Sequence, residues 1–542
     1  MKNKYSGTPR LWLWLSVVSV TSLLAIIPAH GQSIVQSWEG IQKQARDTDP
    51  PDPHGAPGPA GVIAVVNWEI SYYTKSGSIV WGPTNLPSFF VGNTGAGNQN
   101  ADPRAIFDHA SRRFFVIMQE NHNSRFWLNV AVSRNSDPRS SGAGDWIIYR
   151  FDATEYSLSI NSAGGANYGG DYPGMAVDSQ ALYVAYRMFG FVPAGTISGC
   201  GCHVLNSALL IMNKAQLIAG NGTLVSLYTP DALTLQPVTP ASGSPGNVMY
   251  MIGNQDNSTL KLYAVSDPLN TRTLNSRLIT VADVGPGPAS NAPQLGSTIP
   301  INMVTRKMQG NVVLVGGDLW CTMTRGEPAG PAVAAYWRVR LNGWPLIPFV
   351  GPTLQEEGTV GANTDWNYCP SISANLAGDV AITWTRSSST RAAAMMLAWR
   401  TAYVSTFGAP NVVQTSQAPA IDLDNTGTFS RWGDYFSVWP DPNDGSFWAV
   451  SEWTRADTGT WSTWWAQVSM PPRDFFVNRN APNPGTQDGS PAFPYTTVWP
   501  AHFNITSGTL HIFGGHYNEQ LTLNKAVTLE AFSGGPVTIG AP

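Results

Sequence analysis

The sequence is organised by a phrase that returns along most of its length. Each copy begins with a short polar segment, often containing proline, and continues as an apolar strand, a tight turn rich in Asp, Asn and Gly, and a second apolar or aromatic strand. The clearest copies begin at Asp102, Asp171 and Asp434. A unit that recurs at a spacing of roughly 45–75 residues indicates a repeat architecture. In such an architecture the chemistry lies at loop ends.

Each copy holds about four short strands of alternating or wholly apolar character, which is the signal of a β-strand. In the second copy these strands are predicted at 104–107, 114–120, 126–133 and 146–152. Units of about four strands, repeated about seven times, favour an all-β fold with an approximately seven-bladed β-propeller over residues 60–470. Closure into a ring hides the strand edges that an open array exposes. Six or eight blades stay open as alternatives, because the first and fourth copies are weak.

Composition narrows the classes of partner. Only 12% of the 542 residues are charged and the net charge is −4, which excludes a basic surface for nucleic acid. The 53 Gly and 41 Pro are typical of strands joined by tight turns. The 21 Trp have two interpretations, packing between sheets or exposed platforms for sugar rings.

The N-terminus predicts export. Residues 1–31 combine basic residues near the start, an apolar run over 11–27 and the small-residue exit Ala29-His30-Gly31, as a secretory signal does. We therefore expect a secreted or cell-surface protein with no membrane span after signal removal, and a monomer. Residues 32–59 are expected to form a short amphipathic helix over 34–46 followed by a proline-rich linker.

Four cysteines suit an oxidising compartment. Cys321 ends one repeat's second strand and Cys369 starts the next repeat, so we expect a Cys321–Cys369 disulfide between neighbouring repeats. Cys200 and Cys202 then remain, as a strained local bridge or as free thiols. With His203 they supply too few ligands for a closed tetrahedral metal site.

The turn Asp441-Pro-Asn-Asp-Gly-Ser-Phe-Trp448 resembles the Ser-x-Asp-x-Gly-x-x-Trp motif of the sialidase-like, Asp-box family of secreted β-propellers, with Asn443 at the Asp position and Asp441 at the Ser position. A looser copy runs from Ser373 to Val380. The side-chain oxygen of such a turn accepts backbone N–H groups and Gly takes a positive φ, so the motif implies a stabilised turn and no catalysis.

Residues 471–542 have a different sequence pattern from the repeats. A Pro-Tyr-Thr-Thr segment at 494–497 and the phrase Gly515-His-Tyr-Asn-Glu519 resemble the opening coil of the right-handed parallel β-helices of the pectate-lyase-like group. The resemblance implies a short C-terminal β-helix-like segment. It implies no lyase chemistry, because the later coils that carry that chemistry have no counterpart here.

Polar residues precede each predicted innermost strand, where propeller binding sites gather at the central channel. We expect these residues to face one cavity as ligand-binding residues: Asp102, Arg104, Asp171, Tyr172, Asp365, Tyr368, Arg431, Asp434 and Tyr435.

The resemblance to sialidases implies three convergent arginines, a Tyr–Glu pair and an acid. Candidates for the catalytic residues are Arg104, Arg431, Tyr435 and Glu452, with Arg187 or Arg306 as the third arginine. The family's Arg-Ile-Pro phrase is missing. We therefore expect a non-catalytic binding or scaffold protein that recognises an extracellular glycan or protein at its channel face. A sialidase-like or other glycoside hydrolase is the alternative.

No cofactor is predicted. Oxygen ligands for Ca²⁺ cluster at 422–425 and 441–444, but neither turn has the spacing of a known calcium loop, and solvated turns are the simpler interpretation.

Overall fold

The computed structural model describes residues 33–540, apart from 45–46, 48, 91–99, 123–124, 155–167, 191–203, 232, 242–246, 283–290, 327–329, 403, 422–426, 457–458, 471–472, 482–486, 488, 490–493, 506–507 and 524–526. The predicted signal, Cys200, Cys202 and the turn at 422–425 lie outside the described residues.

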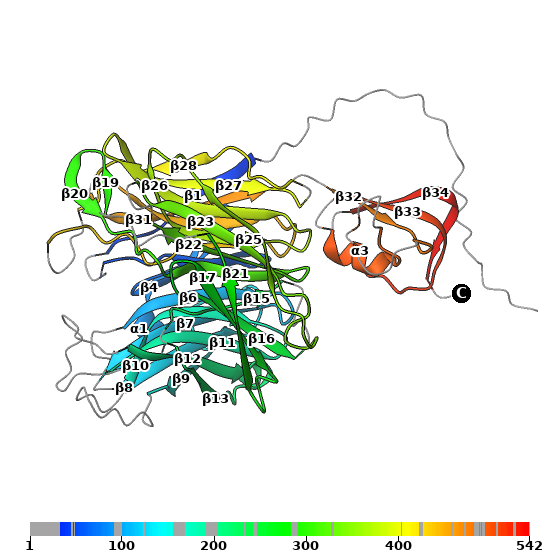
Figure 1. Cartoon of the computed structure of the whole chain (residues 1–542), viewed down its shortest axis with the longest axis horizontal. Helices are drawn as coiled ribbons and strands as arrows, with labels where there is room; N and C mark the ends of the chain where they lie inside the picture. The colour runs from blue at the N-terminus through cyan, green and yellow to red at the C-terminus, as the bar shows by residue number, and fades with distance from the viewer. Residues whose placement is uncertain are drawn as a thin grey trace, which may run out of the picture.

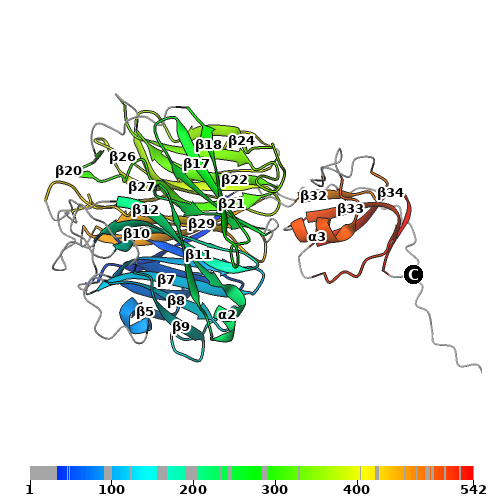
Figure 2. The same cartoon turned by 60° about the horizontal axis from the view of Figure 1, so that its bottom comes forward.

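The chain forms a seven-bladed β-propeller (Figures 1 and 2). Seven antiparallel sheets surround one axis, each with its first strand innermost, as the recurring phrase predicts. The blades are β2–β5 (His54–Pro57, Gly61–Val66, Glu69–Thr74, Ile79–Asn85); β6–β9 (Asn100–Asp108, Arg113–His122, Arg125–Ser133, Trp146–Asp152); β10–β13 (Tyr168–Val177, Ala181–Gly190, Val204–Asn213, Leu224–Thr229); β14 and β16–β18 (Gln236–Pro237, Val248–Asn254, Thr259–Ser266, Thr273–Thr280); β21–β24 (Met308–Val315, Asp318–Arg325, Val333–Arg340, Thr353–Val360); β25–β28 (Trp366–Ala374, Val380–Ser388, Arg391–Arg400, Asn411–Thr415); and β29–β31 (Ser437–Pro440, Phe447–Thr454, Trp461–Ser469) with β1.

Strand β1 (Ser33–Gln42) closes the ring by pairing with β31 as the outer strand of the seventh blade. The expectation of a helix over 34–46 is therefore wrong. Burial alternates from Ser33 to Trp38 with the period of two that a strand requires, and the apolar residues were misassigned to a helical face. The expected linker also contains β2, the innermost strand of the first blade.

Most described tryptophans pack inside or between blades. Those less than 2% exposed are Trp146, Trp337, Trp384, Trp432, Trp448, Trp461 and Trp465. Trp38 of β1 lies between the seventh and first blades, with its ring centroid 5.7 Å from that of Trp465 and 4.8 Å from that of Tyr73. Packing is thus the dominant use of tryptophan in the described part of the chain.

The fifth blade has an additional innermost strand. β15 (Thr239–Pro240) pairs in parallel with β21, so the loop between the first two strands of the fourth blade, β14 and β16, adds a strand to the inner edge of the fifth blade. The other elements of this part are the hairpin β19–β20 (Ala292–Gln294, Ser297–Ile301) and two short helices, α1 (Leu86–Phe89) and α2 (Lys214–Ala219).

The C-terminal part is a small body beside the propeller (Figures 1 and 2). Strands β32 (Arg473–Val477), β33 (Gly508–Tyr517) and β34 (Val527–Ile539) pair in parallel, with α3 (Val498–Asn504) between the first two in the chain. Its core also contains Ala377 of the sixth blade.

The expected disulfide is not formed, because Cys321 and Cys369 are free and buried in different cores. Cys321 packs in the hydrophobic cluster of the fourth and fifth blades, whereas the Cys369 thiol lies 3.4 Å from the Gly433 carbonyl oxygen. Chain proximity of two strand ends did not fix the directions of their side chains.

We expect Trp38→Ala to lower the free energy of unfolding by about 3 kcal/mol, because it removes the large side chain that joins β1 to both flanking blades. Urea denaturation measures the change. Trp499, whose side chain is 54% exposed, provides the matched control Trp499→Ala, for which a change within about 0.5 kcal/mol is expected. Equal effects of the two substitutions would contradict this account of ring closure.

Candidate functional site

Four inner strands begin with the same backbone device. Asp52, Asp102, Tyr172 and Cys369 each precede a proline and each has a positive φ, between 46° and 59°. In β6, β10 and β25 the strand register shifts at this point. A bulge of this kind turns a side chain out of the strand's ordinary alternation. It is uncommon for residues other than Gly and costs energy, so its repetition marks this end of the channel as a candidate site.

The centre of this end is a pair of buried carboxyl groups, Asp52 and Asp102, which are 2% and 6% exposed. A side-chain hydrogen bond joins them, and such a bond between two carboxyls needs a proton. Asp52 accepts the backbone N–H of Asp434 at 2.6 Å and the amide of Asn67 at 2.8 Å. Gln119 donates to Asp102 at 2.6 Å. The pair therefore ties together the first, second and seventh blades.

Burial is the main reason that this pair holds a proton. Burial, followed by the charge of Asp434, raises the pKa of Asp52 to about 7. Burial also raises the pKa of Asp102 well above its usual range, with Asp171, Asp52 and Asp434 adding to the effect. Both carboxyl groups therefore keep their protons to a higher pH than ordinary aspartates do.

Three more accessible charged residues surround the pair. Asp171 is exposed, and the guanidinium of half-buried Arg431 donates to Asp434 at 3.0 Å. We call Asp52, Asp102, Asp171, Arg431 and Asp434 the acidic mouth.

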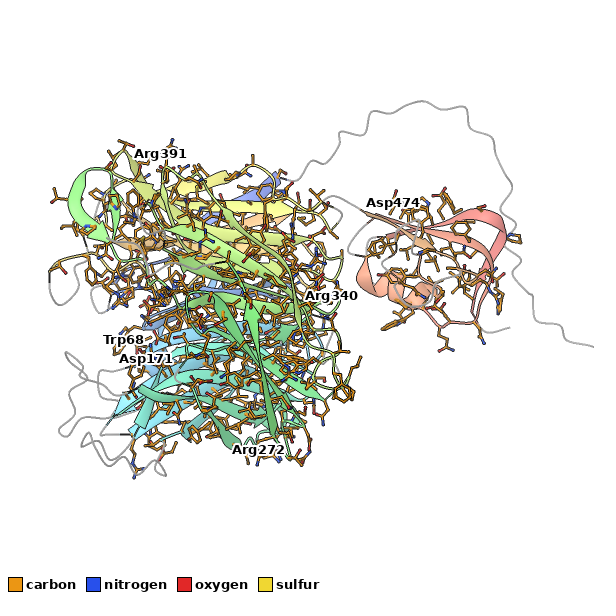
Figure 3. All side chains as sticks on the ribbon, in the orientation of Figure 1. Trp68, Asp171, Arg272, Arg340, Arg391 and Asp474 are labelled. Atoms are coloured by element: carbon orange, nitrogen blue, oxygen red, sulfur yellow. The ribbon has the colours of Figure 1, made fainter. Side chains whose placement is uncertain are left out.

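Trp68 lies at the same end of the propeller as Asp171, opposite to Arg340 (Figure 3). It follows Asn67, whose side-chain oxygen accepts the backbone N–H of Asp102 at 2.7 Å. Its φ is 78°, a strained conformation for a bulky residue, and its indole N–H is buried with no hydrogen-bond acceptor in the described structure.

Arg104, Tyr172 and Tyr435 form a buried layer next to the acidic mouth. The Arg104 guanidinium carbon lies 3.4 Å from the centroid of the Tyr435 ring, and Arg104 is 1% exposed. The Tyr435 hydroxyl donates to the Pro103 carbonyl at 3.2 Å, and that of Tyr172 donates to the Asp434 carbonyl at 2.8 Å. Burial raises the pKa of both tyrosines well above the usual range, so both are neutral donors.

A further set of side chains crosses the axis between blades. The backbone N–H of Ala105 donates to Nδ1 of His54, so Nε2 carries the proton and donates to Asn311 at 3.2 Å. Asn311 in turn donates to the Val438 carbonyl at 2.6 Å. Burial, followed by the charge of Arg104, lowers the pKa of His54 well below its usual range. This neutral network separates the acidic mouth from the opposite end of the channel.

Several sequence-predicted residues lie away from the acidic mouth. Asp365 faces Arg391 and Arg386, with N···O distances of 3.5 Å and 3.9 Å. The Tyr368 hydroxyl meets that of Ser387 at 3.2 Å.

The Tyr435 hydroxyl donates to the Pro103 carbonyl, so the expected Tyr435–Glu452 pair is not formed. Glu452 is buried near Tyr368 and Cys369 instead. The charge of Glu452 helps to raise the pKa of both residues. Of the arginines considered as a third member, Arg306 donates to Asn257, while Arg187 lies opposite Asp171 in the strand register.

The two Asp-box-like turns lie elsewhere and use their oxygens internally. Asp441 accepts the indole N–H of Trp448 at 2.9 Å and pairs with Lys75 at 2.6 Å, so an ammonium group occupies the place considered for Ca²⁺. Asn375 accepts the backbone N–H of Asp379 at 3.0 Å and donates to the Gly445 carbonyl, which connects the two turns.

Sequence reasoning missed Asp52, His54, Asn67, Gln119 and Asn311. A signal for Asp52 was present, because Asp52-Pro53 repeats the Asp102-Pro103 pair, but it stood in the segment assigned to a linker. Asn67, Gln119 and Asn311 come from turns or middle positions of strands and carry no local signature.

Comparison with models of known protein families finds no match, and comparison with curated proteins finds none. Solved structures with a similar arrangement include a Trypanosoma rangeli sialidase mutant displaying trans-sialidase activity (9% identity, 74% of this chain and 57% of that chain, TM-score 0.34). The NanB sialidase of Streptococcus pneumoniae is also similar (10% identity, 75% of this chain and 74% of that chain, TM-score 0.37). So is a prolyl endopeptidase (11% identity, 77% of this chain and 50% of that chain, TM-score 0.33). Structural similarity this weak is found for proteins with different activities, so it assigns no activity to this chain.

We expect Asp102→Asn to stabilise the protein at neutral pH. The folded-state pKa of Asp52, about 7, lies above the unfolded value of about 4. The pair's contribution to stability is therefore fully present below about pH 4 and is lost as pH rises through about 7. An Asn at position 102 can still donate to Asp52 and accept from Gln119, and it tolerates a positive φ.

Urea unfolding from about pH 4 to about pH 8 measures this effect. The stability curve of Asp102→Asn should fall less steeply with pH than that of the native protein. Asp474→Asn, at a side chain that is 60% exposed, should run parallel to the native curve. A native curve parallel to that of Asp102→Asn would contradict the shared-proton assignment.

Proposed function

We propose that this protein is an extracellular, non-catalytic glycan-binding propeller whose ligand sits at the acidic mouth. The observation that supports the proposal is that some charged side chains at this end of the channel are open to solvent and others are buried. Of the catalytic candidates, Arg104, Tyr435 and Glu452 are fully buried, whereas Arg431 and its neighbours Asp171 and Asp434 remain accessible to solvent. A nucleophilic tyrosine must reach substrate, and the hydroxyl of fully buried Tyr435 is held by a backbone carbonyl.

The accessible groups match the hydrogen-bonding needs of a sugar. Carboxylates accept from hydroxyl groups and a guanidinium donates to them with a planar fork, so Arg431 beside Asp434 presents both functions at one place. Trp68 adds an aromatic side chain on the same rim, held in a strained backbone conformation. A ligand that stacks on this indole gives a reason for the strain.

Export rests on the sequence of residues 1–31. Within the described residues, no helix is both long and apolar enough to span a membrane.

Glycoside hydrolysis is the second candidate, favoured by one observation. A carboxyl group with a pKa near 7, as found for Asp52, has the protonation that a general acid requires. Asp52 is 2% exposed and uses both oxygens within the fold, which is why binding is preferred.

A glycan array followed by calorimetry on the best glycan tests the proposal. We expect Arg431→Gln to weaken binding by about 10-fold or more, since it removes a charge-assisted donor. Arg391→Gln, at a 54% exposed arginine on the same end of the propeller, should leave the affinity unchanged. Absence of binding, or an equal loss in both variants, would contradict glycan recognition at the acidic mouth.

A screen of chromogenic glycosides separates the two candidates. The binding proposal predicts no turnover. Turnover that disappears in Asp102→Asn or Glu452→Gln would establish a hydrolase instead.

A further inference from the structure

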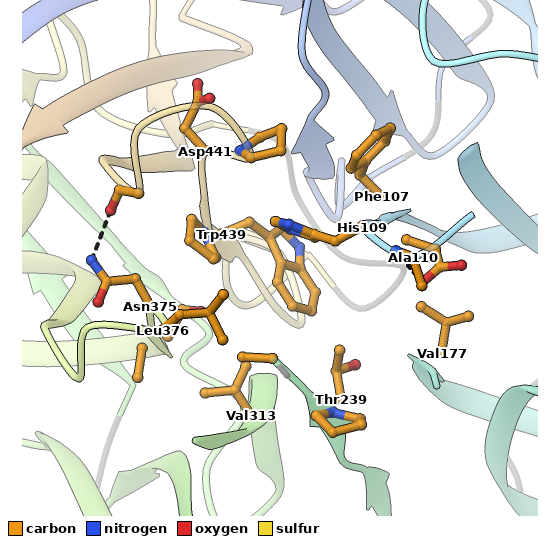
Figure 4. Close-up of a pocket in the computed structure, with 18 of the residues that line it drawn as sticks. Phe107, His109, Ala110, Val177, Thr239, Val313, Asn375, Leu376, Trp439 and Asp441 are labelled. Carbon is orange, nitrogen blue, oxygen red and sulfur yellow. Dashed lines mark hydrogen bonds between the residues drawn. The ribbon is translucent and has the colours of Figure 1, made fainter. Parts of the chain in front are cut away.

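A pocket lies at the opposite end of the channel from the acidic mouth. Its walls come from the far ends of inner strands, including Phe107 of β6, Val177 of β10, Val313 of β21 and Trp439 of β29. The pocket has a volume of about 100 Å³. The Trp439 indole stands at its centre, with Leu376 and Val313 on one side and His109 on the other (Figure 4). We call this space the apolar pocket.

Each carboxylate in the lining of the apolar pocket already has a lysine or several hydrogen-bond donors as partners. Asp108 pairs with Lys214 at 2.8 Å, and Asp441 pairs with Lys75 at 2.6 Å. Asp178 accepts two backbone N–H groups and the Tyr183 hydroxyl. None of these carboxylates is left to hold a cation, so the pocket suits a neutral ligand.

Three residues of the lining each have one buried polar atom with no hydrogen-bond partner in the described structure. These atoms belong to the indole N–H of Trp439, the Ser373 hydroxyl and the Thr239 hydroxyl. Trp439 is 8% exposed and Ser373 is 0% exposed. A buried unsatisfied donor costs roughly 1–3 kcal/mol, so three of them around one apolar space point to an occupant that supplies oxygen atoms.

We propose that the apolar pocket binds a small, neutral, mainly apolar ring compound that carries one or two hydrogen-bonding oxygens. The walls match its ring, and the Trp439, Ser373 and Thr239 groups match its oxygens. At about 100 Å³ the pocket is smaller than a cavity of about 150 Å³ that holds benzene, so a single ring is the largest group it can take. A free sugar suits it less well, because three polar atoms cannot satisfy the many hydroxyls of a hexose. The crossing network of His54 and Asn311 makes this site separate from the acidic mouth.

The full-length mature protein is tested with p-hydroxybenzaldehyde as the probe, by calorimetry and saturation-transfer NMR. We expect saturable binding, and binding at least 10-fold weaker for p-hydroxybenzoate, whose carboxylate finds no cation in the lining. Methyl β-glucoside should not compete with the probe. Absence of probe binding, or equal affinity for the anionic analogue, would overturn the proposal.

Two variants locate the probe. Trp439→Phe keeps an aromatic ring and removes the donor, and should weaken binding by about 5-fold. Leu376→Trp fills the pocket from a partly exposed position and should abolish binding. Trp499→Phe, the same exchange at an exposed site, should leave the affinity unchanged. Circular dichroism confirms folding of each variant. Probe binding that survives both pocket substitutions in folded protein would place the ligand elsewhere, whatever the glycan experiments show.

Discussion

The proton held between Asp52 and Asp102 is the interaction on which this end of the propeller depends. Two adjacent buried carboxylates cannot both be ionised without a large cost in free energy, and one proton turns their repulsion into a hydrogen bond. Through Asp434, Asn67 and Gln119 the pair connects the seventh, first and second blades. The ring is thus closed twice, at its periphery by β1 and near its axis by a shared proton.

The same axis divides the molecule into two chemically different ends. Polar side chains that cross between blades, such as His54, Asn311 and Tyr172, fill the middle of the channel with neutral hydrogen bonds. One end gathers carboxylates and an accessible arginine, and the other gathers apolar side chains around Trp439. The two ends therefore suit different ligands, polar and hydroxyl-rich at the first, apolar and neutral at the second.

The sequence predicted the blades well because strand alternation and turn chemistry are local. The strands expected from Arg104 to Asp152 correspond to β6–β9, and the blade count is seven. The N-terminal strand was mistaken for a helix because its identity depends on pairing with β31, more than 400 residues away in sequence. The predicted disulfide was wrong for a related reason. Chain position brought Cys321 and Cys369 to neighbouring strands, but their thiols point into different cores.

The candidate site was predictable only in outline. Of the polar residues predicted before the inner strands, Asp102, Asp171 and Arg431 lie together at one end of the channel. The bulge that follows a positive-φ residue determines which of these side chains turn inward, and this cannot be read from residue type alone. Asp365 has the same chemistry as Asp102, but it faces Arg391 instead.

The most direct test of this account is an infrared titration of carboxyl groups in native protein and in Asp102→Asn. We predict that near pH 6, where ordinary aspartates are ionised, the native protein retains the C=O stretching band of protonated buried carboxyl groups, and that this band is weaker in the variant. Loss of every protonated-carboxyl band below about pH 5 in the native protein would contradict the shared proton.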